Sequence, residues 1–286
     1  MNSPIPIILL HHNEFHFLER AISAIHTRTV YPYKLCIVDN LSRKNDSFWN
    51  KLTSRFEVEV IFNNRNNWIY GFNLAKHHFG GQFIVLSDAD IVVPVQCDGI
   101  CWMSHLLDQM RSYPYIGKLG LSLDLTYLRT RSDLSRVLDS ELAFKEGSKI
   151  GSNVISPVDS TLAMYRRDVF ICSFRMQIGH QRLVRPYFFT ARTSDTFECE
   201  HLGWTRYETA MGEGTFDSTR LIEKARFFGL YGISLPRDLF DALPTSSRLR
   251  YVATLNIVRA FHFLKIYFLW LIFALKTFPK SCYIKS

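Results

Sequence analysis

Short apolar runs and longer segments with helical periodicity alternate along roughly the first ninety residues. The run Ile5–Leu10 is continuously apolar, which is typical of a strand buried on both faces. From Glu14 to Thr27 the apolar residues recur at helical spacing. Three more apolar runs follow, separated by two further helical segments, and they are Lys34–Val38, Val58–Phe62 and Phe83–Leu86. The alternation predicts an α/β fold with an open, mostly parallel sheet.

Polar residues follow each of these four runs. Right-handed crossovers bring the carboxyl ends of parallel strands to one edge of the sheet, and such sheets bind ligands in the crevice at that edge. We therefore expect the polar clusters to converge in space. They are His12-Asn13-Glu14, Asp39-Asn40, Asn63 to Asn67, and Asp88-Ala89-Asp90.

The pattern is less regular in the second half of the chain. It predicts a helix from Cys97 to Met110 and strands at Lys118–Leu123 and Pro157–Tyr165. The segment Ser132–Asn153 is polar and contains glycine, and we interpret it as a loop or lid over the site. The stretch from Met176 to Gly214 is irregular and rich in Arg, Thr, His and aromatic residues.

The segment Leu249–Ser286 differs in kind from the rest of the chain. Its apolar stretch Ile266–Leu275 is too short to span a hydrocarbon core, which needs about twenty residues. Basic residues lie at helical spacing before and after this stretch, at Arg259, His262, Lys265 and Lys276. The pattern favours a basic amphipathic helix in the membrane interface. A terminal helix packed on the domain and a true membrane span remain as alternatives.

Composition narrows the class of protein. The 286 residues, 47% hydrophobic and 21% charged, suit one large domain with a small appendage and exclude a disordered chain. Lys and Arg exceed Asp and Glu by 34 to 26, and a net charge of +8 favours an anionic partner. The six cysteines show no CxxC pair and no zinc-ligand spacing, so we expect a reducing compartment. The N-terminal apolar run is too short for a signal peptide, which predicts a cytoplasmic protein.

Asp88-Ala89-Asp90 is the motif with the clearest chemistry. Two carboxylates two residues apart at a strand end can share one hard cation that bridges a diphosphate. A single motif of this kind is more often a turn or helix cap. Here it ends the fourth strand of an α/β unit, and Asp39 stands at the end of the second. This context favours a metal site.

Four sequence blocks resemble the nucleotide-sugar half of family 2 glycosyltransferases with the GT-A fold. In order, they are IPIILLHHNEFHFLERAISAI, KLCIVDNLS, NNRNNWIYGFNLAK and FIVLSDADIVVP, and they cover roughly residues 4 to 95. The resemblance implies a GT-A domain over residues 1–248. Its Rossmann-like nucleotide-binding half would be residues 1–95 and its acceptor half residues 96–248, with residues 249–286 as the membrane-associating tail. It also implies a transferase that uses a nucleoside diphosphate sugar and a divalent metal, Mn²⁺ or Mg²⁺.

The resemblance assigns roles to the polar clusters. His12, Asn13 and Glu14 would line the nucleotide. Asp39 would accept a hydrogen bond from the imide N–H of the base, or is an ordinary turn residue at a strand end. Asp88 and Asp90 would hold the metal on the diphosphate, Asp90 more directly. The residues matching the block that approaches the ribose and diphosphate are Asn67, Gly71 and Asn73. Trp68 and Tyr70 either stack on a base or sugar or pack in the core.

The acceptor half departs from the commoner family pattern, in which a Glu-Asp pair before a helix supplies the catalytic base. Candidates for that base are Asp159, Asp195, Glu198 and Glu200, which spacing does not rank, and an enzyme that retains the anomeric configuration needs none. His201 is either a third metal ligand or a surface residue. Four arginines either contact the diphosphate or an anionic acceptor or are solvated charges, and they are Arg182, Arg185, Arg192 and Arg206.

These observations favour an enzyme that moves a sugar to a glycan or a lipid-linked glycan at the cytoplasmic face of a membrane, in bacterial surface polysaccharide or lipopolysaccharide synthesis. The anionic membrane surface would bind the tail. A nucleotidyltransferase acting on sugar phosphates is less favoured, because the loop after the first strand lacks glycine and basic residues. A non-enzymatic membrane or nucleic-acid binding module would need a basic stripe, but the Lys and Arg residues outside the tail are dispersed, so we expect no nucleic-acid partner.

Overall fold

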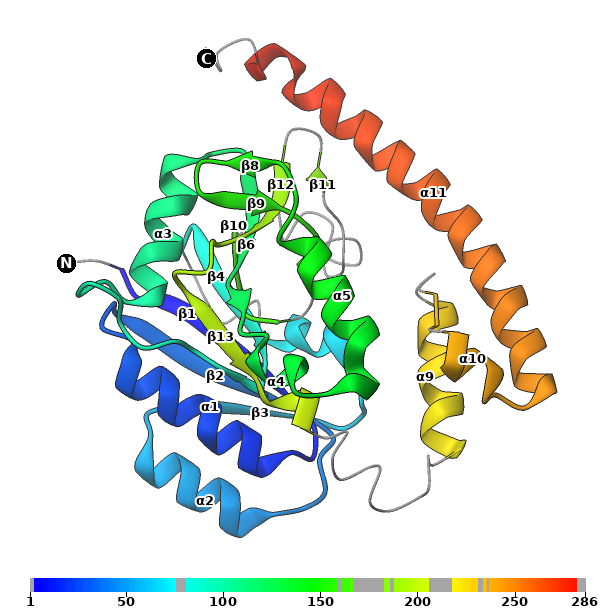
Figure 1. The fold of residues 1–286 in the computed structure, drawn as a ribbon, viewed down its shortest axis with the longest axis horizontal. Coiled ribbons are helices and arrows are strands. Elements are labelled where there is room, and N and C mark those ends of the chain that lie inside the picture. Colours follow the sequence, from blue (N-terminus) through cyan, green and yellow to red (C-terminus); the bar gives the residue numbers. More distant parts are fainter. Residues whose placement is uncertain are drawn as a thin grey trace. The chain divides into compact units, whose positions relative to one another are not determined.

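The computed structural model describes residues 3–75, 81–158, 161–166, 183–185, 188–205, 218–230, 234–235 and 237–281. The chain divides into two compact units, Met1–Trp204 and Thr205–Ser286, each of which is described by itself (Figure 1). The sequence analysis placed the start of the tail at residue 249, a division that stays a prediction.

The first unit is built on a mixed sheet in which ten strands are described. Its order is β3-β2-β1-β4-β10-β6-β12-β9-β8, with β11 paired to β12. The first four strands in this order run parallel, which confirms the predicted parallel sheet. Their bounds are β1 (Ile5–His11), β2 (Tyr33–Asn40), β3 (Glu59–Asn63) and β4 (Phe83–Asp88).

The remaining strands of this sheet are mostly short and their directions are mixed. β10 runs antiparallel to both β4 and β6, whereas β12 is parallel to β6 and antiparallel to β9. The bounds are β6 (Ile116–Gly120), β8 (Lys149–Ile150), β9 (Asn153–Ile155), β10 (Ala163–Arg166), β11 (Leu183–Arg185) and β12 (Phe188–Arg192).

Strands β1, β2 and β4 are buried on both faces over most of their length, as their continuous apolar runs predict, whereas the residues of β3, at the edge of the sheet, are exposed or half-buried. On β1, Ile7 and Leu9 belong to one core with α1 (Phe15–Arg28), α2 (Asp46–Arg55) and α3 (Trp102–Ser112). Ile8 points the other way, into a second core beneath η1 (Trp68–Leu74). Figure 1 shows α1 and α2 beside strands β1 to β3. The third predicted helical segment, between the third and fourth strands, is this 3₁₀ helix in the described residues, and residues 76–80 lie outside them.

The acceptor half corrects one prediction. The segment Ser132–Asn153 is not a loop, because it contains η2 (Ser132–Leu134), α5 (Ser135–Phe144) and β8. No residue of α5 is fully buried, so its few half-buried apolar positions leave a weak helical pattern in the sequence. The short helix α4 (Thr126–Arg129) precedes η2.

A small second sheet places β13, late in the first unit, beside the segment that follows β4. β13 (Glu198–His201) pairs antiparallel with β5 (Ile91–Val92) and parallel with β7 (Ser122–Leu123). The strand predicted over Lys118–Leu123 is thus divided between β6 and β7, which belong to different sheets. The segment η3 (Leu202–Thr205) follows β13 directly.

The second unit is helical in its described residues. α9 (Ser218–Leu230) and α10 (Arg237–Asp241) share a small core with the first turns of α11 (Thr245–Ser281). The Tyr251 hydroxyl accepts a hydrogen bond of 2.7 Å from the Leu235 N–H inside this core. Beyond residue 255 of α11, the apolar side chains that the structure describes are mostly exposed. Among the described residues, no helix combines the length and apolarity that a membrane crossing requires.

Candidate active site

The loops that follow β1, β2, β3 and β4 lie at one edge of the parallel sheet, which we call the carboxyl edge (residues 11–14, 39–43, 63–71 and 88–90). Asp88 is half-buried at the end of β4, in register with Leu10 of β1. Asp90 lies in the turn between β4 and β5 and is 5% exposed. Its backbone carbonyl accepts a hydrogen bond of 2.8 Å from the Leu202 N–H, which joins this turn to η3.

Asp90 and His201 approach one point in space from two sides. A methyl group at Gly203 would clash with Oδ2 of Asp90 and would lie 2.6 Å from Cε1 and 3.0 Å from Nδ1 of His201. Glycine is therefore required at this position for steric reasons, because no other residue leaves both side chains in place. The His201 ring stacks on Trp204 at 4.9 Å with an interplanar angle of 6°, which orients the imidazole.

The His201 imidazole has an unused hydrogen-bonding atom. Nδ1 is buried and has no hydrogen-bond partner among the described residues. Leaving such an atom unsatisfied costs roughly 1–3 kcal/mol, which a bound ligand would recover. His201 is half-buried, and the choice between a third metal ligand and a surface residue stays a prediction.

A divalent cation fits this pair of side chains. An imidazole nitrogen and a carboxylate are both ligands of Mn²⁺, and Mg²⁺ commonly takes one or two carboxylates and completes its shell with water and phosphate oxygens. Within the part of the chain that the structure describes, no group of three or more His, Cys, Asp or Glu side chains could hold a metal by itself. The remaining ligands of a cation here would have to include diphosphate or water oxygens.

A buried hydrogen-bonded group links the ends of β1 and β2. His11 donates from Nδ1 to Oδ1 of Asp39 over 2.8 Å, and the Ser42 hydroxyl donates to the same oxygen. The Ser42 N–H donates to the other oxygen, Oδ2, over 3.1 Å. Burial raises the pKa of Asp39, but these hydrogen bonds outweigh it and hold that pKa below its usual value. Asp39 thus carries a stable negative charge. Its bonds to Ser42 hold the turn at the end of β2, and its contact with a base stays a prediction.

The first two loops of the carboxyl edge are joined by further bonds. His12 Nδ1 donates to the Asn40 carbonyl over 2.9 Å. The Asn13 N–H donates to the Ser42 hydroxyl, and the side-chain oxygen of Asn13 accepts from the Arg43 N–H, each over 2.7 Å. Asn13 has a φ of 65°, which asparagine tolerates better than most residues. The loop residues predicted to line a nucleotide are therefore held in one arrangement.

Asn40 connects the second loop to the third. It is 1% exposed, and its side-chain oxygen accepts from Nδ2 of Asn63 over 2.9 Å and from the Asn67 N–H over 3.2 Å. Its own Nδ2 donates to Oδ1 of Asn66 over 3.0 Å. A side chain at Gly71 would run into Leu10 and Asn40, so this glycine permits the close approach of η1. Asn73, like Asn67, is half-buried.

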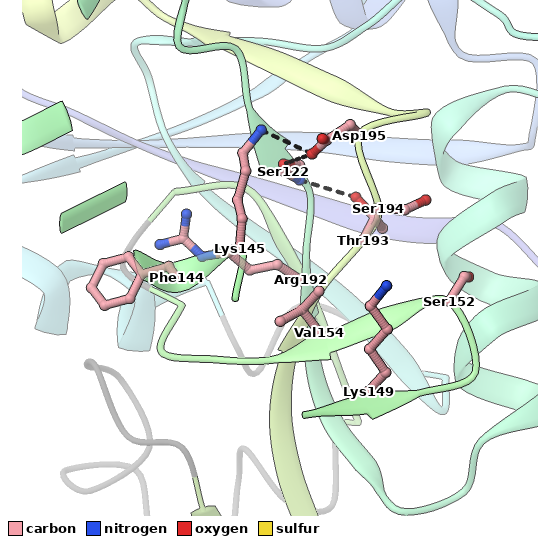
Figure 2. Close-up of a pocket in the computed structure, with 10 residues that line it drawn as sticks. All are labelled: Ser122, Phe144, Lys145, Lys149, Ser152, Val154, Arg192, Thr193, Ser194 and Asp195. Carbon is pink, nitrogen blue, oxygen red and sulfur yellow. Dashed lines mark hydrogen bonds and ion pairs between the residues drawn. The ribbon is translucent and has the colours of Figure 1, made fainter. Parts of the chain in front are cut away.

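The candidate bases are paired with cations. Lys145 donates to Oδ1 of Asp195 over 2.8 Å and to Oε1 of Glu198 over 2.6 Å, and Figure 2 shows its side chain extending to Asp195. This hydrogen bond lowers the pKa of Asp195, which makes that carboxylate a weak base. Glu200 is half exposed and pairs with Arg20 over 3.2 Å. The choice among them stays a prediction, and Asp159 lies outside the described residues.

The structure also bears on the predicted arginines and aromatic residues. Arg192 is 5% exposed and pairs with Glu141 over 2.6 Å, so for this residue the solvated-charge alternative is wrong. The structure does not describe the side chains of the remaining predicted residues, which are Arg182, Arg185, Arg206, Trp68 and Tyr70.

Four residues at or near the site were missed by the sequence analysis: His11, Asn40, Lys145 and Gly203. His11 had a signal, because it extends an apolar run with a polar residue at a buried position. Asn40 directly follows Asp39 and was noted only as its neighbour. Nothing local marks Gly203 or Lys145, since their partners lie far away in the sequence.

Comparisons with known proteins agree with this architecture. The model of Glycosyl transferase family 2 matches residues 7–174, more than half of the chain. No curated protein sequence that was compared matches the chain.

Two solved structures illustrate the likeness in fold. The mannosyltransferase PcManGT from Pyrobaculum calidifontis, in complex with GDP-Man and Mn²⁺, is 13% identical with a TM-score of 0.55, over 97% of this chain and 81% of that one. GalNAc-T7, with UDP, GalNAc and Mn²⁺, is 14% identical with a TM-score of 0.50, over 69% of this chain and 43% of that one. At such identities the likeness shows the GT-A fold alone. The family match, the GT-A architecture and the carboxyl edge together establish that this chain belongs to glycosyl transferase family 2 and is a glycosyltransferase.

Proposed function

We propose that the protein transfers a sugar from a nucleoside diphosphate donor to a glycan or lipid-linked glycan, with Mn²⁺ or Mg²⁺ bound at Asp90 and His201. The observation that carries the proposal is the meeting of Asp90, in the turn after β4, and His201, at the end of β13, beside Gly203 of η3. Both solved structures above were obtained with Mn²⁺ and a nucleotide or nucleotide sugar, which supports the same chemistry here.

Asp90 and His201 would hold the metal, and Asp88 would add a second carboxylate. When bound, the cation acts as a Lewis acid that neutralises the charge developing on the departing diphosphate. The chain itself contributes rigid placement, because Asp90 is held by η3 through Leu202 and His201 is held by Trp204. Such preorganisation avoids reorganisation of the ligands during the reaction.

The other loops of the carboxyl edge would bind the nucleotide. In this proposal His12, Asn13 and Glu14 line the nucleotide and Asp39 contacts its base. The block Asn67, Gly71 and Asn73 approaches the ribose and diphosphate. The hydrogen bonds from Asn40 support this placement, because they connect the loops after β2 and β3. The acceptor hydroxyl would lose its proton to one of the acidic side chains Asp159, Asp195, Glu198 or Glu200, unless the enzyme retains the anomeric configuration.

The acceptor would be presented at the cytoplasmic face of a membrane, in bacterial surface polysaccharide or lipopolysaccharide synthesis. Support comes from α11, in which Phe261, Phe263, Leu264 and Phe268 are each more than 60% exposed. Aromatic and leucine side chains of this kind insert at the boundary of headgroups and acyl chains, and Arg259 on the same helix suits anionic lipids. The protein should therefore co-sediment with vesicles of anionic lipid. The double variant Phe261→Gln, Phe268→Gln should bind these vesicles several-fold more weakly. Equal sedimentation of this double variant would contradict the membrane proposal.

The catalytic proposal is tested by Mn²⁺ binding and by hydrolysis of nucleoside diphosphate sugars. Asp90→Asn and His201→Gln should each weaken Mn²⁺ binding and lower donor hydrolysis by about a hundredfold or more. Asp108→Asn, at an exposed position on α3, is the matched control and should leave both unchanged. Full hydrolysis in excess chelator, or unchanged Mn²⁺ binding by both site variants, would contradict the proposal. Formation of a nucleoside triphosphate and a sugar phosphate when pyrophosphate is added to the nucleoside diphosphate sugar would indicate nucleotidyl transfer.

A further inference from the structure

A pocket of about 120 Å³ lies between the end of α5, the β8–β9 hairpin and the segment that follows β12 (Figure 2). We call it the Lys149 pocket, and its polar walls include Lys145, Lys149, Ser152, Arg192, Ser194 and Asp195. Sites for whole small ligands occupy about 300–1,000 Å³. The Lys149 pocket therefore fits one substituent of a larger molecule.

Two of the three cations in its walls are already neutralised. Lys145 is shared between Asp195 and Glu198, and Arg192 pairs with Glu141. Burial lowers the pKa of Lys145, but its hydrogen bonds to the two carboxylates outweigh burial and raise that pKa, so Lys145 stays protonated. Arg192 also donates from Nε to the Pro157 carbonyl over 2.9 Å. These two side chains hold the walls together and have little capacity left for a ligand.

Lys149 is placed differently. It is exposed, and within the described part of the chain no carboxylate lies within ion-pair distance of it. In Figure 2 its side chain extends from β8 toward the segment that carries Thr193 and Ser194. Ser152 and Ser194 add hydroxyl groups to the same pocket. An ammonium beside hydroxyl donors complements an oxyanion, because hydrogen bonds to an ionised acceptor are roughly twice as strong as neutral ones.

The pocket is connected to the proposed metal site through one short strand. β13 begins a few residues after Asp195 and ends at His201, and four residues at about 3.3 Å each span roughly 13 Å. Because Asp195 lines the pocket and is itself a candidate base, a group bound at Lys149 and the reacting hydroxyl can belong to one acceptor molecule. We infer that the Lys149 pocket binds an oxyanion, a carboxylate or a phosphate, carried by the acceptor. The inference rests on the proposed glycosyl transfer and adds the charge of the acceptor to it.

NMR on the full chain tests this inference, by saturation transfer for glucuronate and, as the neutral match, glucose, and by ³¹P line broadening for inorganic phosphate. We expect at least one anion to bind at millimolar concentrations and Lys149→Gln to weaken that binding about five- to tenfold. Lys34→Gln, at an exposed position near the start of β2, is the control and should bind as the unaltered protein does. Loss confined to glucuronate identifies a carboxylate, and loss confined to phosphate identifies a phosphate.

Three results would overturn the inference: equal anion binding by Lys149→Gln, glucose binding as strong as that of glucuronate, or no binding of either anion at tens of millimolar. Hydrolysis of the donor by the unaltered protein in the same buffer tests the proposed function independently of anion binding. Absent hydrolysis contradicts that function, whereas the NMR results bear on the pocket alone.

Discussion

The carboxyl edge and the Lys149 pocket belong to the same compact unit, but different interactions hold them together. At the carboxyl edge, amide side chains bond to one another and to backbone groups around Asn40, and the carboxyl groups of Asp39 and Asp90 are buried. Around the pocket, the contacts are ion pairs of Lys145 and Arg192, some of them well exposed. Neutral hydrogen bonds are insensitive to salt, whereas exposed ion pairs are screened by it. The difference predicts a fixed geometry for the proposed nucleotide site and a salt-dependent one for the proposed acceptor pocket.

We expect the largest effect on the carboxyl edge from Gly203→Ala, because Gly203 packs against Asp90 of that edge. The added methyl group would displace Asp90 or His201, and displacements of about 1 Å at a reacting centre cost roughly a hundredfold in rate. We expect donor hydrolysis to fall by that factor and Mn²⁺ binding to weaken. The control is Gly229→Ala on α9, where a methyl group would meet its nearest neighbour at 3.3 Å. Unchanged hydrolysis in Gly203→Ala would remove the role assigned to the Asp90–His201 pair.

Asn40→Ala should be the next largest change. The substitution removes the three hydrogen bonds between the Asn40 side chain and Asn63, Asn66 and Asn67. At about 1 kcal/mol for each bond, we expect the free energy of unfolding to fall by roughly 2–3 kcal/mol. Urea unfolding measures the loss, and the KM for the donor should rise. Asn50→Ala, exposed on α2, is the control. A loss that disappears in high salt would contradict the neutral character of this network.

The buried charge of Asp39 should appear as a pH dependence of stability. Because the pKa of Asp39 is lowered in the folded state, its stabilising contribution is present above the unfolded-state value of about 3.9 and is lost as the pH falls through the folded-state pKa. The difference in unfolding free energy between the protein and Asp39→Asn should therefore be constant near neutral pH and shrink below about pH 4. Chemical unfolding at a series of pH values measures it. A difference that does not change with pH would mean that the His11 and Ser42 bonds do not favour the charged form.

The smallest expected effect is that of Lys145→Met, beside the Lys149 pocket. The side chain of Asp195 is 69% exposed, and exposed pairs contribute about 0.2–1 kcal/mol. The loss should shrink as salt is raised, in contrast to that of Asn40→Ala. A loss of several kcal/mol, independent of salt, would show that the two regions are not built differently.

Much of the fold was predictable because its signals are local. Each strand of the parallel half is a run of apolar residues, and each is followed by polar residues at the edge where parallel strands place their loops. The prediction was wrong for Ser132–Asn153, since α5 packs by half-buried positions and so has a weak apolar stripe. The bonds of Asn40 were not predictable either, because an asparagine in a loop has the same local pattern whether it faces solvent or three other loop residues.

The sequence by itself determined the parallel sheet, the polar clusters at its edge and the motif Asp88-Ala89-Asp90, because periodicity and strand ends are properties of neighbouring residues. Only the tertiary structure decided that His201 lies beside Asp90. The pairing of β13 with β5 brings these distant residues together, and the missing side chain of Gly203 leaves the space in which they meet. Contacts between residues so far apart depend on how sheets and loops pack, which no local pattern encodes.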